Sequence, residues 1–428
     1  MMYHGSILSV SCLLIGLLVV KCDKNNGRYE DSERRPIEIE VSNNNFVINE
    51  NAFSVRCLQE LFIKTGGENM FVSPLSIQYA LAMALNGSSG ETAAEIIDVL
   101  GYGNDIDDVN SIMTSIREYL LSIDNDVELT TANAMLVKKR YTVNPKFCHT
   151  LNTVYFAPVE YVDEDIEIVA ERINEWSSKM TNGFISQLVD KNDIPVDFAA
   201  VLLNALCLRA KWSRCGGFAM FDPELTLVSQ PFFLEDNIGI LVDYLVTTQY
   251  FRYAKRTGYQ AVEIPYANGR LAMYVLLPEE KGIGLDVFLQ SLSAGEWGRL
   301  LGQMKEGPEV HLKMPKFEID KSYELRYVLD AMGIRNAFSP TEALFDKMFD
   351  DQNYSQFYLS NILQHSRINL SEWGTEAAAV TAECVVTDTM IEPENKVYFN
   401  LTRPFVFLIA DKSSDLILFE GVFTGKSI

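Results

Sequence analysis

The stretch from Glu372 to Ala382 reads EWGTEAAAVTA and stands out from the rest of the chain. A buried helix or strand would carry larger side chains, whereas nearly every residue after Trp373 is small. A polar, β-branched stretch then continues as far as Pro393. Side chains this small suit a segment that has to enter a crowded place. The alternative is the end of an alanine-rich helix.

Helices and strands are predicted elsewhere in the chain. Ser73 and Pro74 form a helix start, with a capping side chain followed by proline in the first turn. Residues 75–85 are apolar nearly all round, as in a buried helix, and residues 201–208 predict a strand covered on both faces. Because helices and strands do not alternate regularly, we expect an α+β fold with mixed sheets rather than a doubly wound fold.

Length and charge limit the organisation and the partners of the chain. The 428 residues could form one large domain or two ordinary ones, but no linker and no internal repeat interrupts residues 46–428, which favours a single domain. Lys and Arg number 36 against 58 Asp and Glu, so the formal net charge is −22. Because this field repels polyanions, we expect no nucleic acid, no heparin and no anionic membrane as partner.

An apolar segment near the N-terminus predicts export. Residues 7–20 are nearly all apolar, which is shorter than the ~20 residues of a membrane span but suits the core of a signal peptide. We predict a signal peptide over residues 1–22 and a secreted, extracellular protein; an uncleaved anchor or a buried helix are the alternatives. Residues 23–45 are polar and charged and predict a flexible leader.

Cysteine usage predicts neither a disulfide framework nor a zinc site. Five of the seven cysteines follow the predicted signal peptide, with no C-x-x-C pair and no Cys/His cluster; a single bridge among the five is the alternative. Four N-x-S/T sequons are candidate glycosylation sites: Asn86, Asn353, Asn369 and Asn400.

Enzyme signatures are missing from the sequence. It has no G-x-S-x-G elbow, no HExxH, no Walker loop and no G-x-G-x-x-G, and it has only four histidines. None of the histidines stands in a recognisable catalytic setting, and no acidic pair stands out as a general acid/base couple. We therefore expect a protein that is not an enzyme and that uses no cofactor or metal.

The stretch around Gly374 resembles the proximal hinge of the serpin family. Other blocks resemble serpins in the same order and spacing across nearly the whole chain after the leader, and that order makes the resemblance specific. The blocks are residues 69–77 (NMFVSPLSI), 80–83 (ALAM), 132–134 (ANA), 203–206 (LNAL), 264–266 (IPY), 314–317 (MPKF) and 403–405 (RPF).

The resemblance implies a fold and a mechanism. The expected fold has a large central sheet, about eight or nine helices and an exposed reactive loop at about residues 372–398. In the expected mechanism a serine-type protease attacks this loop and forms an acyl-enzyme, and the cut loop then inserts into the sheet and traps the protease. The hinge residues carried over are Glu372, Gly374, Thr375, Glu376, Ala377, Ala378, Ala379, Val380 and Thr381.

Alternation along the inserted strand singles out one residue as a misfit. Side chains in a strand point to opposite faces in turn, so an inward Thr375 implies that every second residue after it also points inward. Ala377, Ala379 and Thr381 are small enough to slip between existing strands. Glu383 is not, because a buried carboxylate without a partner is costly.

The resemblance also places the reactive bond. The family usually cuts after the seventeenth residue counted from the glutamate before the hinge, which here is Asp388, so the predicted bond is Asp388-Thr389. An acidic residue there suits a protease with a basic pocket, of the granzyme or caspase kind, and a secreted protein would meet the former. A cut at Val386, Thr387 or Met390 would suit elastase- or chymotrypsin-like proteases. No Lys or Arg lies between Gly374 and Asn395, which disfavours trypsin-like targets.

Further family positions match residue by residue. Ser73, Ser76 and Asn204 match the shutter, where the central sheet opens, and Gln364 stands where the family usually has histidine, with His365 beside it. Gln can still donate and accept hydrogen bonds. Trp212 matches the tryptophan at the point where the loop joins the sheet, and Lys316 is expected to pair with Glu372; the alternative is a solvated surface pair.

Two other functions remain open. A non-inhibitory serpin, such as a carrier, storage protein or chaperone, would tend to have a bulky or charged hinge, and the hinge here is mostly small. An undetected enzyme is the second alternative. A heparin-activated inhibitor is disfavoured because residues 104–128 are acidic. We expect a monomer whose partner is the target protease, in a covalent complex.

Overall fold

The computed structural model describes residues 46–103, 105–121, 127–163, 165–194, 198–214, 219–267, 269–279, 284–305, 308–350, 357–360, 362–375 and 396–426. The predicted signal peptide, the predicted leader and loop residues 376–395 lie outside these ranges, as does the sequon at Asn353. Within the described ranges, no helix is long and apolar enough to cross a membrane.

The helices follow the local signals in the sequence. Ser73 caps the second helix by accepting a hydrogen bond from the Ser76 backbone, Pro74 occupies the first turn, and almost all of the helix is buried, as predicted. The described part of the chain has nine α-helices: α1 (Phe46–Lys64), α2 (Pro74–Gly87), α3 (Gly90–Leu100), α4 (Ile106–Leu121), α5 (Pro145–Thr153), α6 (Ile166–Met180), α7 (Leu285–Ser291), α8 (Ala294–Gln303) and α9 (Arg326–Met332). Short 3-10 turns are η1 (Lys191–Asp193), η2 (Pro223–Leu225) and η3 (Asn336–Phe338).

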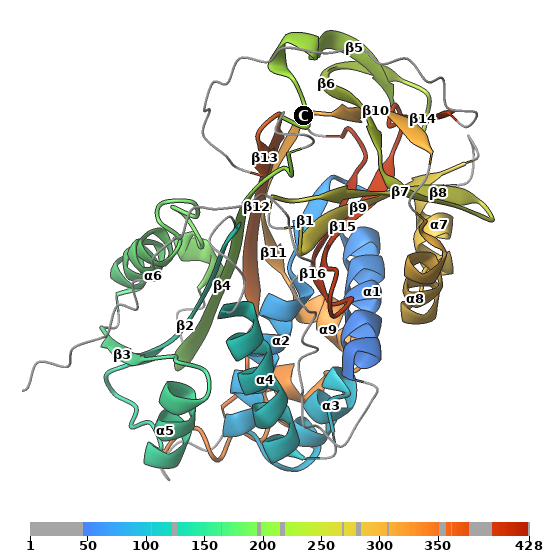
Figure 1. Cartoon of the computed structure of the whole chain (residues 1–428). Helices are drawn as coiled ribbons and strands as arrows, with labels where there is room; N and C mark the ends of the chain where they lie inside the picture. The colour runs from blue at the N-terminus through green and yellow to red at the C-terminus, as the bar shows by residue number, and fades with distance from the viewer. Residues whose placement is uncertain are drawn as a thin grey trace, which may run out of the picture. The chain divides into compact units, whose positions relative to one another are not determined.

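The strands form three sheets (Figure 1). The central sheet has the order β11 (Phe317–Glu324), β12 (Leu363–Ser371), β13 (Gly374–Thr375), β4 (Ala200–Lys211), β2 (Val127–Lys138), β3 (Val159–Val162). A second six-stranded sheet has the order β1 (Met70–Val72), β16 (Ile417–Phe423), β15 (Phe405–Asp411), β9 (Leu271–Pro278), β8 (Tyr259–Pro265), β7 (Arg252–Arg256). The third has the order β14 (Lys396–Asn400), β10 (Glu309–Pro315), β6 (Gly239–Tyr250), β5 (Leu227–Phe233). The predicted α+β fold with mixed sheets and a large central sheet is therefore confirmed.

The middle of the central sheet is the feature that positions the site. β13 is only two residues long and pairs antiparallel with β12 on one side and with β4 on the other. Beyond β13, β4 and β12 have no ladder with each other among the described strands. We call this boundary between β4 and β12 the seam.

Each face of the central sheet packs against a different layer. On the inner face, side chains such as Leu208 and Ile368 join the main hydrophobic core, which also contains most of α2. On the outer face, Leu203 and Cys207 join a second cluster with Val169 and other residues of α6. Figure 1 shows α6 lying against β2 and β4. The predicted strand over residues 201–208 is therefore covered on both faces, as expected.

Candidate functional site

The hinge residues Gly374 and Thr375 already occupy the top of the seam. Thr375 lies opposite Ala210 of β4 and Leu370 of β12, and it is 1% exposed. Its hydroxyl shares a 2.7 Å hydrogen bond with the Tyr266 hydroxyl. Gly374 has a φ of +139°, and a Cβ added there would lie 2.1 Å from the Ala210 carbonyl oxygen. Only glycine fits this position without moving the backbone of β4.

Trp212 anchors the turn that leads from β12 into the hinge. Its indole Nε1 donates to the Ser371 carbonyl at 2.9 Å, and its backbone N–H donates to the Trp373 carbonyl at 3.2 Å. The indole stacks on the Tyr266 ring with a centroid distance of 4.8 Å, and Tyr266 is also the partner of Thr375. The predicted Trp212 and the unpredicted Tyr266 thus hold the hinge in place together.

Glu372 is held by a lysine and a threonine from two other elements. Lys316 Nζ and Thr226 Oγ1 each donate to Glu372 Oε1 at 2.8 Å, and the glutamate is 8% exposed. Burial alone would raise the pKa of Glu372, but the hydrogen bond from Lys316, with those from the backbone and Thr226, holds the pKa below its ordinary value. The carboxylate is therefore charged at neutral pH. The structure brings the predicted pair together as a largely buried ion pair on the glutamate side, not as a fully solvated surface pair.

The predicted shutter residues form one hydrogen-bonded chain beneath the seam. Ser76 Oγ donates to Asn204 Oδ1, and Asn204 Nδ2 donates to Asn133 Oδ1 on β2. Asn133 Nδ2 continues the chain to the Tyr155 carbonyl at 2.8 Å. Ser73 Oγ donates to the Leu418 carbonyl at 2.9 Å, which ties the start of α2 to β16. The local sequence indicates no role for Asn133 beyond its place in the block 132–134, and its direct pairing with Asn204 places it in the shutter.

Gln364 joins the shutter from the other side of the seam. Its Nε2 donates to the Ser73 carbonyl at 2.8 Å, but its buried Oε1 has no hydrogen-bond partner among the described residues. A buried acceptor without a partner is costly, so this oxygen is a place where an incoming donor would be stabilised.

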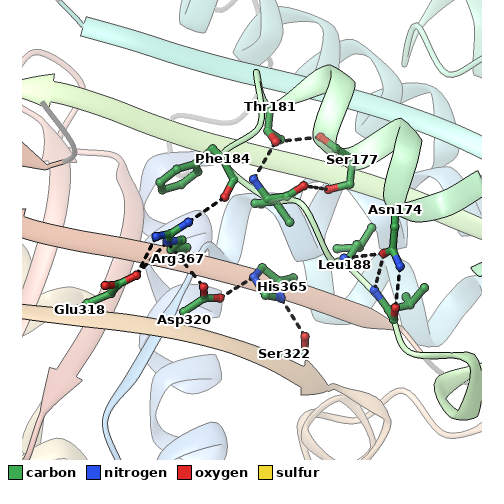
Figure 2. A network of polar contacts seen from close by, with 12 residues as sticks. Asn174, Ser177, Thr181, Phe184, Leu188, Glu318, Asp320, Ser322, His365 and Arg367 are labelled. Carbon is green, nitrogen blue, oxygen red and sulfur yellow. Dashed lines mark hydrogen bonds and ion pairs between the residues drawn. The ribbon is translucent and has the colours of Figure 1, made fainter. Parts of the chain in front are cut away.

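His365 points to the opposite face of the sheet and takes no part in the shutter. Its Nε2 lies 2.8 Å from Asp320 Oδ1 and its Nδ1 lies 2.8 Å from Ser322 Oγ (Figure 2). Burial lowers the pKa of His365, and the neighbouring Asp320 only partly opposes this shift. The residue beside Gln364 therefore does not replace the histidine that the family usually has in the shutter.

The two hinge residues of β13 lie at the top of the seam, with the shutter residues below them, and comparison with known proteins agrees with this arrangement. A family model described as serpin (serine protease inhibitor) matches residues 48–425. The chain belongs to the serpin family. A serpin-like protein of Thermococcus kodakarensis is 31% identical over 87% of this chain and 83% of its own. Mouse leukocyte elastase inhibitor A is 28% identical over 86% of this chain and 96% of its own. The crystal structure of the thermophilic serpin tengpin in the native state aligns with a TM-score of 0.81 at 25% identity, covering 90% of this chain and 95% of tengpin.

Most of the predicted reactive loop of this serpin lies outside the described residues. Lys396, at the start of β14, resumes the described chain after the loop, so both loop ends lie in sheets. The predicted bond Asp388-Thr389, its alternatives Val386, Thr387 and Met390, and the hinge residues from Glu376 to Thr381 lie outside the described residues.

The sequons of this serpin differ in exposure. Asn86 is half-buried, and its side-chain nitrogen donates to the Ala82 carbonyl at 2.8 Å and to Asn110 Oδ1 at 2.9 Å. Asn369 is half-buried on β12, whereas Asn400 is exposed on β14. Cys57 and Cys148 are free thiols, the first buried and the second half-buried. In the part of the chain that the structure describes, no group of three or more His, Cys, Asp or Glu side chains could hold a metal ion.

Proposed function

We propose that this serpin inhibits serine-type proteases by acting as a suicide substrate. The protease serine attacks the carbonyl carbon of Asp388, the Asp388-Thr389 amide bond breaks, and Thr389 leaves as a free amine while Asp388 stays bound as an ester. The freed strand then inserts into the seam before water can hydrolyse the ester. The observation that carries the proposal is β13, because two hinge residues are already paired with both strands that border the seam.

The register of β13 fixes where the inserted residues would lie. Continued along the seam, it puts Ala377 opposite Leu208 and Ile368 on the inner face, where a small side chain suits the buried surroundings. The same register puts Thr381 opposite Asn204 and Gln364, so its hydroxyl can reach the unpaired Gln364 Oε1. Insertion would therefore supply the donor that the shutter lacks.

The same register places Glu383 among apolar side chains, opposite Leu202 and Ile362, both of which pack against the main core. We expect Glu383→Ala to speed insertion, because the wild-type carboxylate must be neutralised or desolvated on the way in. The number of inhibitor molecules cut for each protease trapped should fall about tenfold, measured by titrating protease activity at pH 7.5. Lowering the pH to 5 should bring the wild type closer to the variant.

Glu392→Ala is the matched control for this prediction, since Glu392 follows the predicted bond and would not insert with the cut strand. Equal turnover of wild type and Glu383→Ala at both pH values would show that the inserted strand does not follow the register of β13.

The target class follows from the residue at the bond. Asp388 suits a protease with a basic pocket, whereas Val386, Thr387 or Met390 would suit elastase- or chymotrypsin-like enzymes. Because residues 7–20 resemble a signal peptide, we propose that the encounter takes place outside the cell.

A panel of granzyme-, elastase-, chymotrypsin- and trypsin-like proteases tests the proposal on denaturing gels with mass spectrometry. A complex that survives denaturant would establish the trap, and a released peptide that begins at Thr389 would establish the bond. Cutting of the loop by several proteases without any stable complex would instead mean a non-inhibitory serpin.

A further inference from the structure

The segment that follows α6, residues 181–189, crosses the outer face of the central sheet at the seam. Its Phe184 is 3% exposed and belongs to the cluster that packs beneath α6. Two arginines flank the Phe184 ring, one from each bordering strand. The guanidinium carbon of Arg209 on β4 lies 5.3 Å from the ring centroid, and that of Arg367 on β12 lies 5.5 Å from it. The ring thus bridges the two strands that the inserting loop would have to separate.

Both arginines also hydrogen-bond to the backbone of the same segment. Arg209 Nη2 donates to the Asn182 carbonyl at 3.4 Å, and Arg367 Nη1 donates to the Phe184 carbonyl at 3.3 Å (Figure 2 shows the Arg367 side). The contacts are therefore polar as well as cation–π, and they reach the segment from opposite sides of the seam.

A carboxylate on the neighbouring strand holds each arginine in position. Arg209 lies opposite Glu128 of β2, with a nitrogen–oxygen distance of 3.6 Å. Arg367 lies opposite Asp320 of β11 and forms a 2.8 Å ion pair with Glu318 on the same strand. The two halves are arranged alike, with an acid outside, an arginine next to it, and Phe184 in the middle.

The segment is bound firmly to α6. Ser177 Oγ donates to the Ile185 carbonyl at 3.0 Å, and the Ile185 N–H donates to Thr181 Oγ1 at 2.9 Å. Asn174 accepts from the Leu188 N–H at 2.7 Å and donates to the Val189 carbonyl at 2.9 Å (Figure 2). The arginines therefore tie the two strands to α6 and not to a loose loop.

We propose that Arg209, Phe184 and Arg367 form a clasp across the seam that has to open before the loop can insert beyond Thr375, and that this clasp sets the rate of insertion. The proposal rests on the proposed function and deepens it. In the register of β13, residue 376 would lie opposite Arg209 and residue 378 opposite Arg367, and both would point to the outer face, where the Phe184 ring lies between the two arginines. In the register of β13, Arg209 lies one position and Arg367 three positions beyond Thr375, so the clasp meets the advancing strand first.

The surroundings leave room for this opening. A cavity of about 310 Å³ lies between the segment and the sheet, lined by residues that include Leu188, Asp193, Asp320, His365 and Arg367. Arg367 borders this space, so its side chain can turn away from Phe184 without displacing the core.

Peptide uptake tests the clasp without any protease. A fluorescent, acetylated peptide with the sequence of residues 376–387, carrying serine in place of Cys384, would be mixed with the intact full-length protein. We expect Arg209→Gln and Arg367→Gln each to take up the peptide about fivefold faster than wild type, and the double variant faster still. Phe184→Leu, which keeps an apolar side chain in the cluster, should behave like a single arginine variant.

Arg172→Gln is the control, because Arg172 of α6 pairs with Glu160 of β3 and does not touch the seam. A general loss of stability would also lower the thermal midpoint of the loop-cleaved form, whereas an open clasp leaves that midpoint unchanged. Uptake at the control rate would overturn the clasp. Faster uptake without any trapped protease would uphold the clasp and overturn only the inhibitory function, and no uptake by any form would overturn both.

Discussion

Gly374→Ala is expected to expel β13 from the central sheet and to abolish the proposed trapping, so that a protease cuts the loop without being held. The added Cβ would meet the Ala210 carbonyl oxygen at 2.1 Å and the Lys211 Cα at 2.7 Å, and both are backbone atoms of β4. β4 cannot yield easily, because it is paired with β2 from Ala200 to Ala210. The φ of +139° adds strain for any residue with a side chain. We expect the free energy of unfolding to fall by about 3 kcal/mol, measured by denaturant unfolding of the uncut protein.

The effect on trapping follows from the same overlap, since the inserted strand also has to place residue 374 beside Ala210. Gly298→Ala is the matched control: Gly298 lies on the exposed side of α8, where an added Cβ meets nothing within 4 Å. It should be neutral or slightly stabilising. Wild-type stability and trapping in Gly374→Ala would show that β13 does not approach β4 as closely as described.

The second large effect is a loss of stability as the pH rises from 5 to 8. Glu50 of α1 and Glu420 of β16 are fully buried, and both oxygens of Glu420 lack a hydrogen-bond partner in the described ranges. Burial raises the pKa of Glu50 to about 8, against the smaller opposing effect of hydrogen bonds such as that from the Tyr102 hydroxyl. Burial, together with the charge of Glu50, also raises the pKa of Glu420 well above its ordinary value.

A raised pKa means that the folded protein keeps a proton that the unfolded chain has lost. Its stabilising contribution is therefore complete below the ordinary pKa of Glu and is lost as the pH rises through the folded-state value. At about 1.4 kcal/mol per pH unit, Glu50 alone should cost about 4 kcal/mol between pH 5 and 8. Four other titratable groups lie nearby: Cys57, Tyr79, Tyr102 and Tyr155. Burial raises the pKa of each, and the charge of Glu420 (for Cys57) or of Glu50 (for Tyr79 and Tyr102) adds to the shift.

The double variant Glu50→Gln/Glu420→Gln isolates this contribution. Its midpoint of urea unfolding should change far less between pH 5 and 8 than that of the wild type. Glu296→Gln is the control: burial would raise the pKa of Glu296, but hydrogen bonds from Arg256, Tyr259 and Arg299 lower it, so its effect falls below pH 5. Parallel pH profiles for the wild type and the double variant would contradict protonated acids in the core.

The sequence predicted the parts of the site that lie in short, specific blocks. The small hinge residues, the serine before α2 and the asparagine of β4 all stand in such blocks, and the structure places them around one seam. The role of Tyr266 could not be predicted, although the residue stands in a matching block, because nothing in the local sequence shows that its hydroxyl will meet Thr375. The clasp was missed for the same reason, since Phe184, Arg209 and Arg367 come from three separate stretches.

The buried acids were missed although a signal was present. Glu420 interrupts the apolar strand Ile417–Phe423, and a buried acid in such a strand is stable only when it is paired or protonated. Glu50 gave no such signal, because polar residues surround it in the sequence and only the packing of α1 shows that it is buried.

The short strand β13 has a further consequence for the kinetics of the proposed insertion. In strand addition the costly step is nucleation, because two distant segments must meet before any hydrogen bond offsets the lost conformational entropy. Here the nucleus already exists in the uncut protein, since Gly374 and Thr375 are paired on both sides. What remains after cleavage is propagation, one residue pair after another, from a fixed starting point. The race against hydrolysis of the ester would then depend on how readily the neighbouring strands part, and not on how long a diffusing loop takes to find them.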